Sequence, residues 1–214
     1  MELLIFDLDG TLIDSKLDLA HAVNATRAHM GEPPLAHELI FSYVGNGAPV
    51  LIRRAFPGAS EEQLAASLQY FLDYYREHML DYTVLYPGVR ETLEQLDNGQ
   101  RRLAVLTNKP VRISGDILHG LGVGRHFFRV YGGNSFEQKK PHPIGVETLL
   151  RETGARKERT VMVGDSAVDI QTARNAGISC CGVTYGFQPE SLDENPPDFL
   201  IERMDQIFAA LQLS

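Results

Sequence analysis

The run Leu3-Leu4-Ile5-Phe6-Asp7-Leu8-Asp9-Gly10-Thr11 decides the fold of this chain, because an apolar stretch passes directly into two carboxylates and a glycine. A short continuous apolar run of this kind is typical of a buried β-strand. Open α/β sheets place their functional groups at the carboxyl ends of such strands, which is where Asp7 and Asp9 stand. Two carboxylates so close repel each other and need a cation, a proton or a phosphate-binding neighbour. The sequence is therefore expected to supply a third carboxylate, a lysine and small hydroxyl groups at other strand ends.

Strand and helix patterns alternate along most of the chain. The segments with strand character are residues 3–6, 103–106, 127–131, 161–163, 179–183 and 199–201. Between the later strands, apolar residues recur at helical spacing, and a glycine after the last of them marks each helix end. Those glycines are Gly99, Gly122, Gly154 and Gly177. This alternation predicts an α/β protein with a mostly parallel sheet covered by helices on both faces.

Residues 15–85 interrupt the alternation with helical patterns alone. Ser15 can cap a first helix, Gly45-Asn46-Gly47 forms a turn between two short helices, and Ser60 with Gln63 forms a capping box for a long one. We predict an all-helical insert over 15–85 and a catalytic core formed by 1–14 and 86–214. An insert rooted directly after the aspartates would hang over the site and could open and close; an independent helical domain is the alternative.

Composition limits the partners and the compartment. The chain has 214 residues and a formal net charge of −8, without a basic stripe, which argues against a nucleic-acid partner. No stretch has the pattern of a signal peptide or a membrane span, and Cys180 and Cys181 stand side by side in an expected strand as core filling. We therefore expect a cytoplasmic protein that binds no membrane and exists as a monomer or a homodimer.

Two further strand ends carry groups suited to an anion. Thr107 and Asn108 follow the second core strand, where a hydroxyl and a backbone amide can cradle phosphate oxygens, although such residues also cap helices. Lys139 and Lys140 follow the third, and a lysine there can screen carboxylates and phosphate together. Pro141 restricts the residue before it, which favours Lys140 as the positioned lysine.

The fourth strand end supplies the third carboxylate. Gly164-Asp165 closes an apolar run, and Asp169 follows at the start of a helix. Asp165 is well placed as a hard-oxygen metal ligand. Asp169, one helical turn further on, is suited to hold the neighbours of Asp165 or Lys140 in place, although a carboxylate at a helix N-terminus is also favourable by itself.

These four motifs, in this order, resemble those of the haloacid dehalogenase superfamily of phosphatases over nearly the whole chain. The resemblance matches Asp7 to Thr11 with the D-x-D-G-T motif, Thr107 and Lys140 with the second and third motifs, and Gly164 to Asp169 with G-D-x-x-x-D. It implies a Rossmann-like core, a mobile helical cap inserted after the first strand, and a Mg²⁺-dependent phosphotransfer site.

The resemblance also implies roles for the site residues. Asp7 would attack phosphorus and form an aspartyl-phosphate, while Asp9 would protonate the leaving alkoxide and then activate water, carrying a proton near neutral pH. Mg²⁺ would be held by the carboxylates of Asp7 and Asp165 and the carbonyl of Asp9. Thr107 and Asn108 would hold phosphate oxygens, and Lys140 would offset the crowded negative charge.

Within the superfamily, three segments are similar to phosphoglycolate phosphatases: residues 43–49, 107–110 and 140–143. Gly45, Asn46 and Gly47 offer backbone amides for a second anionic group of the substrate, such as a carboxylate. The expected enzyme is therefore a phosphoric monoester hydrolase acting on a small phosphate ester, with 2-phosphoglycolate as the first candidate.

Other functions remain open from the sequence. A sugar-phosphate or nucleotide phosphatase, or a β-phosphoglucomutase-like phosphomutase, would use the same motifs. A signalling receiver domain also combines an acidic cluster, a Thr and a Lys with Mg²⁺, but the large insert and the second aspartate argue against it. A catalytically silent scaffold would not require four intact motifs.

Overall fold

The first strand, β1 (Leu3–Phe6), lies in the middle of the sheet in this computed structural model, which describes residues 1–213. All of its side chains are buried. It pairs in parallel with β4 (Arg102–Leu106) on one side and β6 (Thr160–Gly164) on the other, with Leu4 opposite both Leu103 and Val161. An uninterrupted apolar run suits this place, because a central parallel strand is covered on both faces.

The sheet has six strands in the order β5-β4-β1-β6-β7-β8, and every neighbouring pair is parallel. The outer strands are β5 (Arg129–Tyr131), β7 (Ser179–Val183) and β8 (Phe199–Ile201). The predicted fold class is confirmed, and all six predicted strands are present. The expected strand 127–131 is shorter, because the Phe127 amide bonds back to Gly124 in the preceding 3₁₀ turn, η1 (Gly124–His126), and does not join the sheet.

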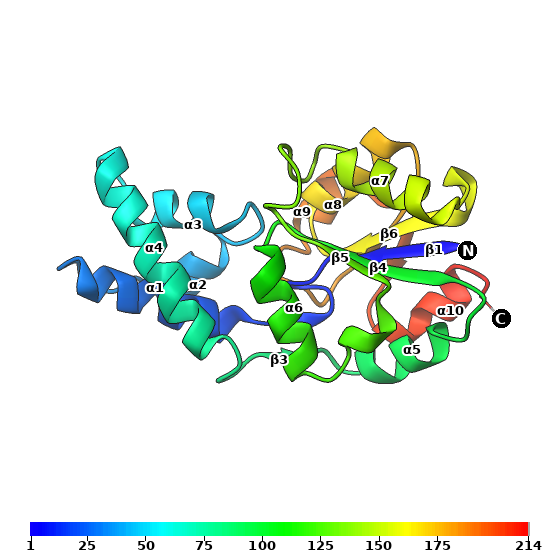
Figure 1. Ribbon diagram of the computed structural model, residues 1–214, viewed down its shortest axis with the longest axis horizontal. Helices are drawn as coiled ribbons and strands as arrows, with labels where there is room; N and C mark the ends of the chain where they lie inside the picture. The colour runs from blue at the N-terminus through cyan, green and yellow to red at the C-terminus, as the bar shows by residue number, and fades with distance from the viewer. Residues whose placement is uncertain (214) are drawn as a thin grey trace. The chain divides into compact units, whose positions relative to one another are not determined.

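Helices cover both faces of this sheet (Figure 1). One face carries α5 (Val89–Leu96), α6 (Val111–Gly120) and α10 (Ile207–Ala210); the other carries α7 (Ile144–Thr153), α8 (Ala167–Ala176) and α9 (Ser191–Glu194). Two further 3₁₀ turns are η2 (Lys157–Arg159) and η3 (Met204–Gln206). Under α7 and α8 the side chains of Leu3, Ile5 and Met162 pack with Leu149 and Ile170 in one buried cluster.

Glycine ends two of these helices in the expected way. Gly154 and Gly177 take left-handed conformations directly after α7 and α8, with φ of 70° and 69°. The helices α5 and α6 end slightly earlier than their glycines, at Leu96 and Gly120.

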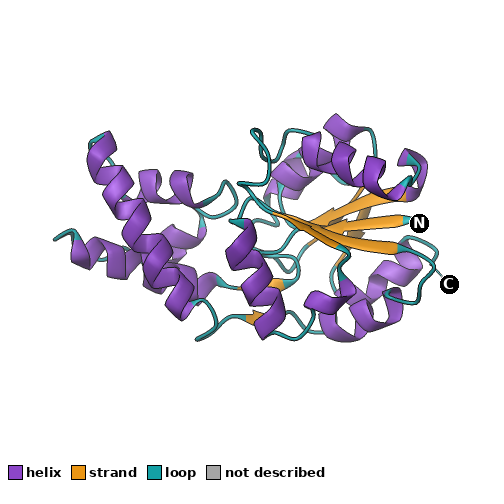
Figure 2. Cartoon of the chain, viewed as in Figure 1, coloured by secondary structure: helices purple, strands orange, loops and turns teal. Residues whose placement is uncertain are grey.

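The chain divides into two compact units, one formed by Met1–Asp14 with Leu85–Ser214 and the other by Ser15–Val84. The second unit contains α1 (Lys16–His29), α2 (His37–Phe41), α3 (Ala48–Ala55) and α4 (Glu61–His78), which loops connect (Figure 2). The end of the expected all-helical insert, Val84–Leu85, is instead a short strand, β3. Within the second unit, α1 packs against α2 and α4, and α3 packs against α4. At the boundary, β2 (Ile13–Asp14) and β3 (Val84–Leu85) form a separate two-stranded sheet.

Two local expectations about the insert have different outcomes. The capping box of Ser60 and Gln63 is present at the start of α4, with both reciprocal hydrogen bonds. Ser15 precedes α1 as expected, but its side chain makes no capping hydrogen bond to the helix.

Two predictions from composition concern the core and the membrane. Cys180 and Cys181 are buried free thiols in β7, which confirms that they fill the core. Among residues 1–213, no helix is both long enough and apolar enough to cross a bilayer.

Candidate active site

The ends of four neighbouring strands gather the polar residues of the core unit. Asp7 follows β1, Thr107 follows β4, Asp165 follows β6, and Tyr185 comes shortly after β7. Because the carboxyl ends of parallel strands meet at one edge of the sheet, residues far apart in the sequence become neighbours there.

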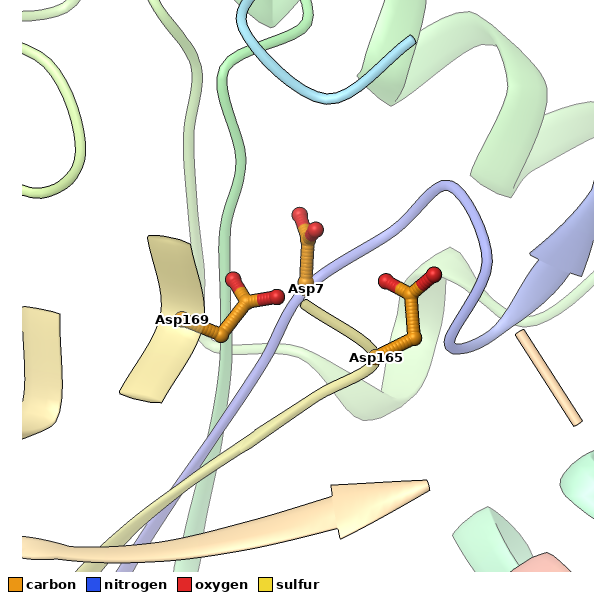
Figure 3. A group of neighbouring side chains, drawn as sticks. All are labelled: Asp7, Asp165 and Asp169. Atoms are coloured by element: carbon orange, nitrogen blue, oxygen red, sulfur yellow. The ribbon is translucent and has the colours of Figure 1, made fainter. Parts of the chain in front are cut away.

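Asp7, Asp165 and Asp169 form a compact acidic cluster. All three are buried, and each offers a carboxylate oxygen within 4.8 Å of the others. Their carboxylate groups are directed into the same small region, although Asp7 follows β1 and the other two lie where β6 passes into α8 (Figure 3). The amide of Asp7 bonds to Val163 O at 2.9 Å, which extends the pairing of β1 with β6 up to this residue.

Lys140 lies between two of these carboxylates. Its Nζ is 2.8 Å from Asp7 Oδ1 and 2.6 Å from Asp169 Oδ1, and its side chain is almost completely buried. Burial opposes the charge, but the two carboxylates prevail and raise the pKa of Lys140 above its usual value. Lys139, in contrast, is exposed. The geometry thus gives Lys140 the position that its neighbour Pro141 indicated.

Asp169 has partners for both of its oxygens. Oδ1 contacts Lys140, and Oδ2 accepts hydrogen bonds from the amide of Ser166 at 3.2 Å and its hydroxyl at 2.7 Å. These bonds join the first turn of α8 to the lysine. Asp169 is therefore suited to hold Lys140 in position.

Asp165 is held through both oxygens as well, but more loosely on one side. Phe187 donates its backbone N–H to Oδ2 at 2.6 Å, and the Thr11 hydroxyl lies 3.5 Å from Oδ1. Gly10 makes room for this carboxylate: a Cβ there would lie 2.2 Å from Asp165 Oδ2, and its φ of +81° also favours glycine.

The pKa values of the cluster indicate that its carboxylates lack sufficient positive charge nearby. Burial raises the pKa of Asp7 and of Asp165 above the usual carboxyl range, the charge of Asp169 raises both further, and Lys140 offsets this only in part. A divalent ion would stabilise the ionised forms, and buried carboxylates are the hard oxygen donors that Mg²⁺ prefers. The residues present therefore fit a hard divalent cation.

Asp9 is paired with Lys109, a lysine that was not among the predicted site residues. Lys109 Nζ lies 3.0 Å from each carboxylate oxygen of Asp9, and both side chains are largely buried. This pair joins the first motif to the end of β4. The signal for Lys109 was its position two residues after Thr107, at the same strand end.

Thr107 and Asn108 are buried beside the cluster. The Thr107 hydroxyl accepts a hydrogen bond from the Lys109 amide at 3.3 Å, and Asn108 Nδ2 donates to the carbonyl of Lys140 at 3.1 Å. The side chain of Asn108 thus joins the second and third motifs. Their expected role in holding phosphate stays a prediction.

The three residues predicted to select the substrate belong to the insert. Gly45, Asn46 and Gly47 form the turn before α3, with φ of 114° at Gly45 and 86° at Gly47. Positive φ at both glycines makes this backbone unsuited to other residues. Binding of a substrate group by this turn stays a prediction.

A fifth segment, residues 184–187, also contacts the site, although no sequence motif indicated it. Residues 184–187 follow β7 and supply the Phe187 amide to Asp165. They carry no charged side chain, so only their place after a predicted strand could have indicated that they belong here.

A parallel sheet with a buried carboxylate cluster and a buried lysine at its strand ends defines an α/β enzyme with an acidic active site. Residues 4–183 match the sequence model of the haloacid dehalogenase-like hydrolases. The chain belongs to this family, as its motifs predicted.

Several relatives share nearly the whole chain. A phosphoglycolate phosphatase of Pseudomonas putida is 41% identical over 94% of this chain and 76% of its own length. One from Vibrio parahaemolyticus is 36% identical over 100% of this chain and 97% of its own. The crystal structure of a predicted phosphoglycolate phosphatase from Haemophilus somnus superposes with a TM-score of 0.94 at 33% identity, covering 99% of this chain and 98% of that one.

Proposed function

We propose that this chain is a Mg²⁺-dependent phosphomonoesterase that hydrolyses 2-phosphoglycolate to glycolate and phosphate. The observation that carries the chemistry is the Asp7 carboxylate, held at the end of β1 beside Lys140 and close to Asp165. The substrate is proposed from the relatives named phosphoglycolate phosphatase, which are similar over nearly the full chain.

In the first chemical step, a carboxylate oxygen of Asp7 attacks phosphorus and the bond from phosphorus to the ester oxygen breaks. Asp9 in its carboxylic acid form gives its proton to the departing oxygen, and the alcohol leaves. The phosphoryl group is then bound to Asp7 as an acyl phosphate. This divides one difficult hydrolysis into two easier steps.

In the second step, water attacks phosphorus and Asp9, now a carboxylate, takes a proton from that water. The bond from phosphorus to the Asp7 oxygen breaks, inorganic phosphate leaves, and both aspartates return to their starting forms. Lys109, with its Nζ 3.0 Å from Asp9 Oδ1, would position this carboxylate.

Positive charge has to be supplied locally, because the chain as a whole is acidic, with a net charge of −8. Lys140 supplies one charge next to Asp7. Mg²⁺, held by the carboxylates of Asp7 and Asp165 and the carbonyl of Asp9, would supply charge stabilisation for the phosphate oxygens. Asp169 would act as a positioning residue for Lys140, and Thr107 and Asn108 would bind phosphate oxygens.

Substrate choice would lie in the insert. The turn of Gly45, Asn46 and Gly47 would bind the carboxylate of 2-phosphoglycolate through backbone amides. Arg53, in contrast, is exposed and forms an ion pair with Glu61 at 2.7 Å, so it is not assigned to the site.

Phosphate release from a panel of esters tests this proposal. The panel contains 2-phosphoglycolate, hexose phosphates and nucleoside monophosphates, each measured with Mg²⁺ and with a chelator. We expect the highest kcat/KM for 2-phosphoglycolate and no release without the metal. Faster hydrolysis of hexose phosphates would overturn the substrate but not the mechanism. An isomerised sugar phosphate in place of free phosphate would identify a mutase, and no turnover of any ester would overturn the function.

A further inference from the structure

The segment Tyr185–Phe187 reaches from the end of β7 across the exits of β6 and β1. Three of its contacts tie it to the first and fourth motifs. The Tyr185 hydroxyl donates to Thr11 O at 2.9 Å, Gly186 lies against Gly10 and Asp165, and Phe187 donates its amide to Asp165 Oδ2 at 2.6 Å. The segment thereby connects the first motif with the fourth.

Position 186 needs a glycine because neighbouring atoms leave no room for a Cβ, and not because of its backbone conformation. Its φ lies outside the left-handed region in which glycine is favoured. A Cβ at this position would lie 2.2 Å from Asp165 Cβ, 2.5 Å from Asp165 Oδ2 and 2.5 Å from Gly10 O. Two of these atoms, a Cβ and a backbone oxygen, cannot move aside without moving the chain that carries them.

The contact to Phe187 orients the same carboxylate. A hydrogen bond from a backbone amide to a charged oxygen is short and strong, and backbone donors are held more firmly than side chains. Tyr185 secures the other side of the segment: its ring packs against Tyr86 with centroids 4.7 Å apart, while its hydroxyl holds the Thr11 carbonyl. The orientation of Asp165 therefore depends on how closely residues 185–187 approach.

We propose that Tyr185–Phe187 is a fifth segment of the active site that positions Asp165 for metal binding, with Gly186 as the residue that permits the close approach. This inference rests on the proposed function, since it assigns Asp165 as a ligand of the divalent ion. Groups that orient metal ligands from outside the coordination sphere change metal affinity without touching the metal.

The test is Gly186→Ala in the full-length protein. Metal binding is measured with Mn²⁺, a hard cation of similar ligand preference, by electron paramagnetic resonance without substrate. We expect the dissociation constant to rise at least about 10-fold. The Mg²⁺ concentration for half-maximal turnover should rise in parallel, while KM for the phosphate ester at saturating Mg²⁺ changes little.

Gly115→Ala is the matched control. It makes the same substitution in the interior of α6, where a Cβ would meet nothing within 4 Å. Metal affinity and turnover should remain those of the wild type, and thermal unfolding should show both variants to be folded.

Each outcome decides something different. A folded Gly186→Ala protein that binds Mn²⁺ like the wild type overturns this inference and leaves the proposed function standing. A wild-type protein that binds no Mn²⁺ overturns both. If Gly186→Ala does not fold, Tyr185→Phe decides, because it removes only the hydroxyl that secures the segment to Thr11. A weaker Mn²⁺ affinity in that variant supports the inference, and an unchanged one overturns it.

Discussion

Asp7 closes the central strand, and its position at the residue scale makes it the proposed nucleophile. The residue is only 8% exposed, and its carboxylate is paired with Lys140 at 2.8 Å. Asparagine has the same shape but lacks the nucleophilic carboxylate. Asp7→Asn should therefore reduce kcat at least about 1,000-fold, because the attacking group is lost.

Steady-state phosphate release checks this prediction, and circular dichroism and thermal unfolding serve as the control for the fold. Turnover near the wild-type rate in the folded variant would exclude Asp7 as the nucleophile.

Lys140 and Lys139 provide a matched pair of adjacent lysines. Lys140→Met leaves Asp7 and Asp169 without the buried cation between them, so we expect a loss of about 3 kcal/mol in the free energy of unfolding without Mg²⁺. Turnover should also fall, because the substrate phosphate loses a nearby positive charge. Lys139 is exposed, and Lys139→Met should change stability by less than about 0.5 kcal/mol.

Urea denaturation of both variants measures the difference. Equal effects of the two substitutions would show that the buried ion pairs of Lys140 do not stabilise the fold.

At the scale of elements, helix α1 is joined to the chain that follows α4 by one buried carboxylate. Asp18 accepts hydrogen bonds from the amides of Tyr82 and Thr83 at 3.1 Å and 2.8 Å, and from the Thr83 hydroxyl at 2.7 Å. Asp18→Ala leaves these donors without their acceptor, and we expect a loss of about 2 kcal/mol. Amide hydrogen exchange at residues 82 and 83 should become faster.

Asp73→Ala is the comparison for this prediction. Asp73 is exposed on α4 and pairs with Arg76 at 3.3 Å, so its loss should cost less than about 0.5 kcal/mol. Unchanged exchange rates in Asp18→Ala would contradict the role given to Asp18.

Most elements could be predicted because their signals are local. The apolar runs of β1 and β4 and the capping box of Ser60 each lie within a few consecutive residues. The start of β5 could not be predicted. The local sequence around Phe127 is compatible both with a strand and with a 3₁₀ turn, and in the structure its amide bonds within the turn. Ser15 likewise has the residue type of a cap but makes no capping bond.

At the scale of the whole molecule, the parallel sheet brings buried carboxylates together at one edge. Their ionisation makes the free energy of unfolding depend on pH and on bound metal. Burial and the charge of Asp169 raise the pKa of Asp7 and of Asp165, so above the usual carboxyl pKa of about 4 the folded, metal-free protein binds more protons than the unfolded chain. The stability from these groups is present at acidic pH and is lost as the pH rises through the raised pKa values.

Mg²⁺ should restore this stability, because it binds the ionised carboxylates of the folded state only. We expect Mg²⁺ to raise Tm by about 2–4 °C more at about pH 8 than at about pH 5. Thermal unfolding with Mg²⁺ and with a chelator at both pH values measures this. A Tm increase of the same size at both would contradict the link.

The sequence by itself determined the class of fold and the motif residues, because strand patterns and strand-end carboxylates are properties of neighbouring residues. Lys140 could also be chosen over Lys139, since Pro141 restricts the backbone next to it. Only the tertiary structure decided that Lys109 pairs with Asp9 and that Gly186 and Phe187 hold Asp165. The physical reason is that these contacts join different strand ends. Their distances depend on how the parallel strands align after each crossover, and no pattern within a single segment records that alignment.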